Sequence, residues 1–506
     1  MQASSDSASP SSRRRATAFA DGLPRAAPSA QGVDADAVAA WLEDVAAAGL
    51  DLHAFMLHRH GHVVAEAWRW PYRADRPRNL HSVAKSFTAC AVGLALEEGR
   101  FQLDDRVVAF FPEAPSDPAH PLAAMTVADL LTMRTGHAGE TSGAAWRQID
   151  SSWVAEFFRI PVAYPPGSQF VYTSAASYML SAIVSRTTGE TLHAYLRPRL
   201  LEPLGIVGET WDIGPDGINP GGNGLVARTA DLLKLGVLHA QRGVWEGRRL
   251  LPESWVTAAT RAQEASGRYG YHWWVHEDGG FSAIGKFVQM VKVFPDHGAT
   301  LAVTGAMKGS KLLMPHIDRY LPKALLSQPF AGEERDARLA AALGEWQRAD
   351  AATPWQRAFD DVLASGFDGA GIDAPATTRC YALDPNDAGA TGLRLTIRER
   401  DCVLTLVDSQ GEHAVTAGFG DWIEGTTDMP GAELHHGYAF HDSPVVARAG
   451  WVDRRRLRMV WIYPETAFRD TVECQLDGDR IEVRRVVNVN SGLLEQELTG
   501  ELRSTS

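Results

Sequence analysis

The stretch that most constrains this chain runs from residue 79 to residue 99, where a serine and a lysine open a long apolar segment. It begins NLHSVAKSF and stays largely apolar up to Gly99, a residue suited to the left-handed conformation that ends many helices. Residues three apart share one face of a helix, so Ser82 and Lys85 are predicted to touch. A helix that is apolar nearly all round has to be buried on every side.

A serine beside a lysine is an arrangement for nucleophilic catalysis. A hydroxyl is too weakly acidic to attack a carbonyl at neutral pH unless a neighbour takes its proton. A lysine does this only when burial or nearby cations lower its pKa. Ser and Lys also meet at this spacing on many surface helices, so the pair alone is weak evidence.

Length and charge narrow the classes of protein to consider. A chain of 506 residues is too long for one core and predicts two or three domains. Its 45% apolar and 22% charged residues are ordinary for globular proteins. The net charge of −13 argues against nucleic acid or an anionic membrane as a partner, and no apolar run is long enough to span a bilayer.

The N-terminus and the cysteines predict a cytoplasmic protein. Residues 1–32 are rich in Ala, Ser and Pro and predict a disordered tail. No apolar stretch follows the arginines at 13–15, as a twin-arginine export signal requires. The four cysteines are scattered along the chain: Cys90, Cys380, Cys402 and Cys474. We expect them to be free thiols in a reducing compartment, and we expect neither a metal nor a cofactor.

Residues 33–326 predict an α+β domain with an antiparallel sheet. A helix is expected after Asp34, and the alternating residues 54–70 predict a hairpin around His60-Gly61. Strand patterns return between 269 and 304, and an all-helical insert is expected at about 106–226. We therefore expect one sheet formed by strands from both ends of the domain, with the helices inserted between them in the sequence.

The C-terminal part has a different pattern. A charged, Ala-rich stretch at 327–360 predicts a helical linker. From 361 to 506, short alternating segments separated by turns predict an all-β domain, either a closed lipocalin-like barrel or a sandwich.

Two further stretches strengthen the catalytic interpretation. In PGSQFVYTS at 166–174, Tyr172 precedes a buried helix, where it could share the proton of Ser82 or simply be a core tyrosine. In GFSAIGK at 280–286, Gly285 would let a substrate approach an edge strand, or would only mark a bulge.

In this order the segments resemble the serine β-lactamase and penicillin-binding-protein superfamily. The resemblance is to its class C branch, to family VIII carboxylesterases and to nylon-oligomer (aminohexanoate-dimer) hydrolases, and it covers roughly residues 34–326. The other matching segments are LDD at 103–105, DLLTMRTG at 129–136, PGSQFVY at 166–172, and GL at 224–225 followed by TADL at 229–232.

The resemblance implies a role for each matching residue. Ser82 would be the nucleophile, Lys85 its base and Tyr172 the proton relay. The backbone N–H groups of Ser82 and Lys286 would form the oxyanion hole. Substrate-binding positions would be Ser174, Ala283, Ile284 and Gly285.

Two of these positions depart from the family pattern. Ser174 replaces the usual asparagine, so no side-chain amide is available to hold a substrate carbonyl. The third motif of the family is Ala283-Ile284-Gly285 in this chain, so Ala283 stands where a cation is usual. The site therefore lacks the common anchor for a β-lactam or peptide carboxylate. Lys286 would point to the other face of a regular strand from Gly285.

Other candidate residues have alternative interpretations. Trp273 and Trp274 could face either the cleft or the core. Neighbouring residues on a helix do not face each other, so His81 is not expected to pair with Ser82. His435 and His436 are interpreted as structural. The aromatic residues of the insert would either line an acyl pocket or pack in the core: Trp146, Trp153, Phe157 and Phe158.

We therefore expect a serine hydrolase that cleaves small ester or amide substrates through an acyl-enzyme on Ser82. The alternative within enzymes is a D-amino-acid peptidase, or a penicillin-binding or β-lactamase activity. The alternative outside enzymes is a ligand-binding protein that uses the C-terminal barrel.

Overall fold

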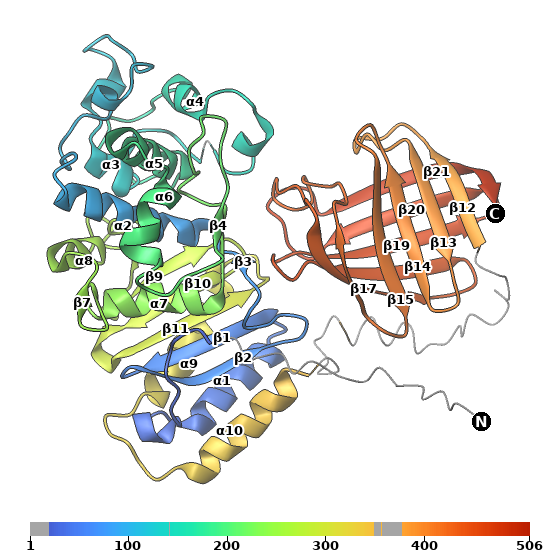
Figure 1. The fold of residues 1–506 in the computed structure, drawn as a ribbon, viewed down its shortest axis with the longest axis horizontal. Coiled ribbons are helices and arrows are strands. Elements are labelled where there is room, and N and C mark those ends of the chain that lie inside the picture. Colours follow the sequence, from blue (N-terminus) through green and yellow to red (C-terminus); the bar gives the residue numbers. More distant parts are fainter. Residues whose placement is uncertain (1–19, 141, 349–355, 357–376, 506) are drawn as a thin grey trace, which may run out of the picture.

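The structure is a computed structural model that describes residues 20–140, 142–348, 356 and 377–505. A domain of helices and sheet carries the Ser82 stretch, and a β-barrel forms the C-terminal part (Figure 1). Within the described ranges, no helix is both long and apolar enough to cross a membrane.

A six-stranded antiparallel sheet forms the centre of the first domain. Strand β1 pairs with both β2 and β11, so the two ends of the domain meet in the middle of the sheet. The predicted hairpin around His60-Gly61 is confirmed, with Arg59 opposite His62. In spatial order the strands are β2 (His62–Trp68), β1 (Leu52–Arg59), β11 (Ala299–Gly305), β10 (Gln289–Phe294), β9 (Phe281–Gly285) and β8 (Trp274–Val275).

Helices cover both faces of this sheet (Figure 1). On one face lie α1 (Ala35–Ala47), α9 (Met314–Ala324) and α10 (Glu333–Trp346). On the other face α7 (Thr229–Ala240) rests on the strands, and a Cβ at Gly236 would lie 2.4 Å from the Val291 side chain. The predicted α+β fold is confirmed.

Helix α2 (Ala84–Glu97) is the buried segment that follows Ser82. It packs against α5 and α6, and its sequence is apolar nearly all round because it is enclosed between the sheet and the helical region. Gly99 takes the predicted left-handed conformation with φ 69°. The helical region contains α3 (Val127–Leu131), α4 (Trp153–Arg159), α5 (Ser174–Thr188), α6 (Leu192–Leu196) and, later in the chain, α8 (Glu253–Ala259).

The prediction of an all-helical insert needs correction. Strands β4 (Thr210–Trp211) and β5 (Leu225–Ala227) pair within the insert, and β5 also pairs with β3 (Arg78–Asn79). Such two- and three-residue strands carry too little alternation to be predicted from sequence. They fix the backbone that leads into Ser82.

Two predicted boundaries also change. Residues 20–32 are not part of a disordered tail, because Arg25 forms ion pairs with Asp21 and Glu66 and the adjoining backbone bonds to Val63. Residues 1–19 lie outside the described residues. The helix predicted within the linker at 327–360 is present as α10, but it packs on the first domain, because its Trp346 lies edge-on against Phe55 with ring centroids 6.2 Å apart. Residues 349–355 and 357–360 lie outside the described residues.

The C-terminal domain is a closed antiparallel barrel, as predicted. Its ten-stranded sheet closes where β15 pairs in parallel with β17. The strands are β12 (Thr377–Leu383), β13 (Gly392–Ile397), β14 (Asp401–Val407), β15 (Glu412–Phe419), β16 (Ile423–Thr427), β17 (Ser443–Trp451), β18 (Arg456–Ile462), β19 (Arg469–Asp477), β20 (Arg480–Val487) and β21 (Glu495–Thr505).

Side chains fill the interior of this barrel. Leu395, Leu404, Trp461 and Val472 are all buried in its core. The internal cavity beside Trp461 measures only about 10 Å³, roughly the least that holds one water molecule. All four cysteines of the chain are free thiols.

Candidate active site

Ser82 and Lys85 meet at the start of α2. Ser82 lies in a short 3-10 turn, residues 81–83, that leads directly into the helix. Lys85 Nζ lies 3.2 Å from Ser82 Oγ and also donates to Ser174 Oγ and to the Gly222 carbonyl, both at 2.9 Å. The predicted contact between the two side chains is therefore present, although Ser82 precedes the α-helix.

The environment of Lys85 suits a base. Its side chain is 1% exposed, and burial lowers the pKa of the amine to about 8 against an opposing effect of Glu140. At pH 7 about one tenth of the amines are then neutral. A neutral amine at this distance can accept the proton of Ser82.

Tyr172 is the third polar group beside the nucleophile. Its ring lies 4.9 Å from Lys85 Nζ and stacks on Trp274 with centroids 5.6 Å apart. Burial raises the pKa of Tyr172, and a hydrogen bond with Ser82 opposes that rise only in part. The phenol therefore stays protonated at neutral pH and has a proton to donate.

Glu140 is a site residue that sequence reasoning missed. Its carboxylate accepts from the backbone N–H of Ser174 at 3.0 Å and from the Thr173 hydroxyl at 3.2 Å, which caps α5. This negative charge raises the pKa of Lys85. Glu140 belongs to no motif, and its role arises from a contact across more than thirty residues, so the sequence offered no signal.

Strand β9 brings the third motif against the nucleophile. A Cβ on Gly285 would lie 2.2 Å from the Leu80 carbonyl oxygen, so only glycine lets the strand come this close. Ile284, Gly285 and Lys286 line the cavity that contains Ser82. The two residues predicted to form the oxyanion hole, Ser82 and Lys286, thus both line this cavity.

Two predicted substrate contacts lie elsewhere. Ala283 is 1% exposed and faces the core between sheet and helices, so it does not line the cavity. Alternate residues of a strand face opposite sides, which places Ala283 away from its neighbour Ile284. Ser174 contacts the Lys85 amine and is not a cavity residue.

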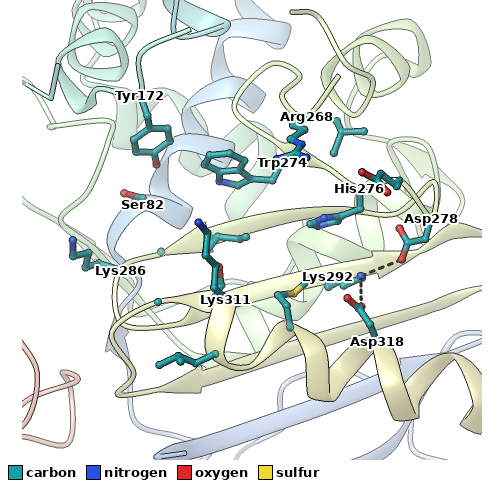
Figure 2. Close-up of a pocket in the computed structure, with 18 of the residues that line it drawn as sticks. Ser82, Tyr172, Arg268, Trp274, His276, Asp278, Lys286, Lys292, Lys311 and Asp318 are labelled. Carbon is teal, nitrogen blue, oxygen red and sulfur yellow. Dashed lines mark hydrogen bonds and ion pairs between the residues drawn. The ribbon is translucent and has the colours of Figure 1, made fainter. Parts of the chain in front are cut away.

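The cavity beside Ser82 has a volume of about 1200 Å³ (Figure 2). Trp274 and His276 line it on one side, and Lys311 lies opposite them. Residues 308–310 and Leu312 also line this cavity. Trp273 is buried in the core, and so are the aromatic residues of the insert, Trp146, Trp153, Phe157 and Phe158.

The C-terminal part also contacts His81, the residue next to Ser82. Arg147 of the insert donates to the Tyr438 hydroxyl at 2.6 Å and to the His436 carbonyl at 3.2 Å. The Tyr438 ring in turn packs against His81, with centroids 5.4 Å apart. Burial keeps the pKa of His81 well below its usual value, so His81 is a neutral packing residue.

Comparison with known proteins finds relatives with hydrolase and esterase names. The chain is 26% identical to the 6-aminohexanoate-dimer hydrolase of Paenarthrobacter ureafaciens over 46% of its own length and 67% of that protein. It is 30% identical to esterase EstB of Burkholderia gladioli over 30% of its length and 43% of that protein. The first curated relatives are matched over 32 to 67% of their own length.

A solved structure shares the fold. A candidate 6-aminohexanoate-dimer hydrolase from Bacillus anthracis aligns with a TM-score of 0.50 and 20% identity, over 60% of this chain and 87% of that one. The family described as Beta-lactamase matches residues 38–311, which is more than half of the chain and includes Ser82, Lys85, Glu140, Tyr172 and Lys286. By this match, and by the arrangement of Ser82, Lys85 and Tyr172 on its fold, the chain belongs to the Beta-lactamase family.

Proposed function

We propose that this protein is a serine hydrolase that cleaves ester or small amide bonds through an acyl-enzyme on Ser82. The observation that carries the proposal is the buried Lys85 amine, with a pKa of about 8, positioned 3.2 Å from Ser82 Oγ at a cavity large enough for a small substrate. The relatives with esterase and dimer-hydrolase names support the same class of reaction.

The reaction follows from the positions of the three side chains. Ser82 Oγ attacks the carbonyl carbon while its proton passes to Lys85 Nζ, and the N–H groups of Ser82 and Lys286 bind the developing oxyanion. The carbonyl then reforms as the bond to the leaving group breaks, Tyr172 delivers a proton to the departing oxygen or nitrogen, and the proton held by Lys85 passes to Tyr172. The amine is then neutral again. Water attacks the resulting ester by the same route and frees Ser82.

Covalent labelling tests the proposal. The protein is incubated with a fluorophosphonate and, separately, with a penicillin, and any adduct is located by peptide mapping. We expect the fluorophosphonate adduct on Ser82, and its absence with both reagents would falsify the proposal. Efficient turnover of a chromogenic cephalosporin would favour a β-lactamase instead, despite Ala283 at the position of the usual cation.

The pH dependence should follow the titration of Lys85. Only the neutral amine accepts the proton of Ser82, so kcat/KM should rise with pH and level off above about 8. The measurement is the hydrolysis of p-nitrophenyl hexanoate between pH 5 and 10 at constant ionic strength, corrected for spontaneous hydrolysis. A profile that is flat between pH 6 and 9 contradicts this assignment.

Replacing Glu140 with glutamine should move that profile. The Glu140 carboxylate favours the charged form of Lys85, so its neutralisation lowers the pKa of the amine and shifts the rising limb to lower pH by up to about one unit. Glu43, an exposed carboxylate on α1, provides the matched control, and Glu43→Gln should leave the profile in place. An unshifted limb in Glu140→Gln would leave Glu140 with a capping role only.

A further inference from the structure

Lysines are rare in this chain, and most of them gather at the cavity beside Ser82. The sequence contains seven lysines against 42 arginines, within a net charge of −13. Four of the seven line the cavity: Lys286, Lys292, Lys308 and Lys311. Lys85 contacts Ser82, and only Lys234 and Lys323 lie elsewhere.

The four lining lysines divide into two groups. Lys292 is 1% exposed and pairs with Asp278 at 3.1 Å and Asp318 at 2.8 Å, so its charge is more than neutralised. Within the described part of the chain, no ion pair or side-chain hydrogen bond involves Lys286, Lys308 or Lys311, and all three are exposed.

Figure 2 shows Lys286 and Lys311 at a different end of the cavity from Lys292. Lys286 and Lys311 lie near Ser82, on the side opposite to Tyr172 and Trp274. The cluster of Lys292, Asp278 and Asp318 lies at the far end. Arg268 adds a further exposed cation on the wall of Trp274, and the exposed Glu277 also lines the cavity.

Unpaired like charges around one cavity repel each other, and a bound anion relieves that repulsion. A carboxylate is the anion that an acyl or leaving group of this size most simply carries, and lysine amines bind it through charge-assisted hydrogen bonds. The third motif lacks a cation at Ala283, but Lys308 and Lys311 reach the same cavity from the connection between β11 and α9.

We infer that the substrates of this site carry a carboxylate, which Lys311 and Lys308 bind together with the Lys286 side chain. This inference rests on the proposed hydrolase function, and it names the class of substrate. Lys308 and Lys311 lie outside the family motifs, so the motifs alone do not indicate that the cavity prefers a negatively charged substrate.

Matched esters test the inference. Mono-p-nitrophenyl adipate and p-nitrophenyl hexanoate have acyl chains of equal length and differ in a terminal carboxylate. A second pair carries the carboxylate on the leaving group. Its members are the hexanoate ester of 3-hydroxybenzoic acid, which is anionic, and the hexanoate ester of methyl 3-hydroxybenzoate, which is neutral. At low ionic strength we expect kcat/KM for the anionic ester to exceed that for the neutral one at least tenfold in one of the two series, with the ratio falling as salt is added.

Lysine variants assign the preference. Lys311→Met and Lys308→Met should each lower the anionic-to-neutral ratio at least fivefold, whereas Lys323→Met, the same change on an exposed lysine of α9 outside the cavity, should leave it unchanged. A ratio near one in both series, or one unaffected in the Lys308→Met/Lys311→Met double variant, overturns the inference. Turnover of the neutral esters would in that case leave the hydrolase proposal standing. If no ester is hydrolysed and Ser82 takes no label, both fail together.

Discussion

Replacing Lys85 with methionine is expected to lower kcat/KM by about 10³-fold, because Ser82 then has no base within reach. The amine donates to three acceptors in the ground state, Ser82, Ser174 and Gly222, so the lysine also holds the serine in place. Lys85→Arg separates these two roles. A guanidinium keeps the positive charge and the donors but does not lose its proton in proteins, so this variant should be as inactive as Lys85→Met.

The measurements are steady-state hydrolysis of p-nitrophenyl hexanoate and the rate of fluorophosphonate labelling at Ser82. Lys85 is buried, so thermal unfolding has to show that each variant folds. Lys234 on α7 provides the matched control, because its side chain is equally buried and lies outside the cavity, and folded Lys234→Met should keep its activity. Labelling of Lys85→Met at the wild-type rate would rule out the lysine as base.

Replacing Tyr172 with phenylalanine should have the second largest effect, and its size should depend on the leaving group. The substitution removes only the hydroxyl and keeps the ring that stacks on Trp274. An anilide departs only when its nitrogen is protonated, so kcat should fall about 10²-fold on an anilide substrate. A p-nitrophenolate leaves without a proton, and its ester should lose much less.

This contrast is measured as the slope of log kcat/KM against leaving-group pKa across a series of aryl esters and anilides. The slope should steepen in Tyr172→Phe. Tyr269→Phe is the matched control, because Tyr269 is a buried tyrosine with its ring centroid 6.2 Å from that of Tyr172, and it does not line the cavity. Equal losses on p-nitrophenyl ester and anilide in Tyr172→Phe would instead indicate that the hydroxyl orients Ser82 and relays no proton.

The barrel contacts the first domain, and none of its described residues lines the cavity beside Ser82. Asn79, three residues before Ser82, donates its backbone N–H to the Glu465 carbonyl at 2.9 Å, and Arg469 pairs with Asp51 at 2.8 Å. These contacts, together with the packing of the Tyr438 ring against His81, hold the segment that carries Ser82 against the barrel. Within the described barrel, buried side chains such as Leu404 and Val472 occupy the interior, and the cavity beside Trp461 measures about 10 Å³.

Some properties of this protein follow from local chain geometry, and the sequence alone predicted them. The contact between Ser82 and Lys85 follows from the three-residue spacing at a helix start, and the burial of α2 follows from its lack of a polar face. The hairpin at residues 60–61 and the antiparallel sheet follow from alternation and turn residues.

Other properties depend on which distant segments pack together, and only the tertiary structure decided them. Glu140 beside the start of α5, Ser174 turned towards Lys85, and Ala283 facing the core are all outcomes of packing between elements far apart in the chain. The lysines at 308 and 311 line the cavity beside Ser82 for the same reason. Spacing along a chain fixes which neighbours meet within one helix or hairpin, whereas the charge that surrounds a nucleophile is set by every segment that the fold brings to it.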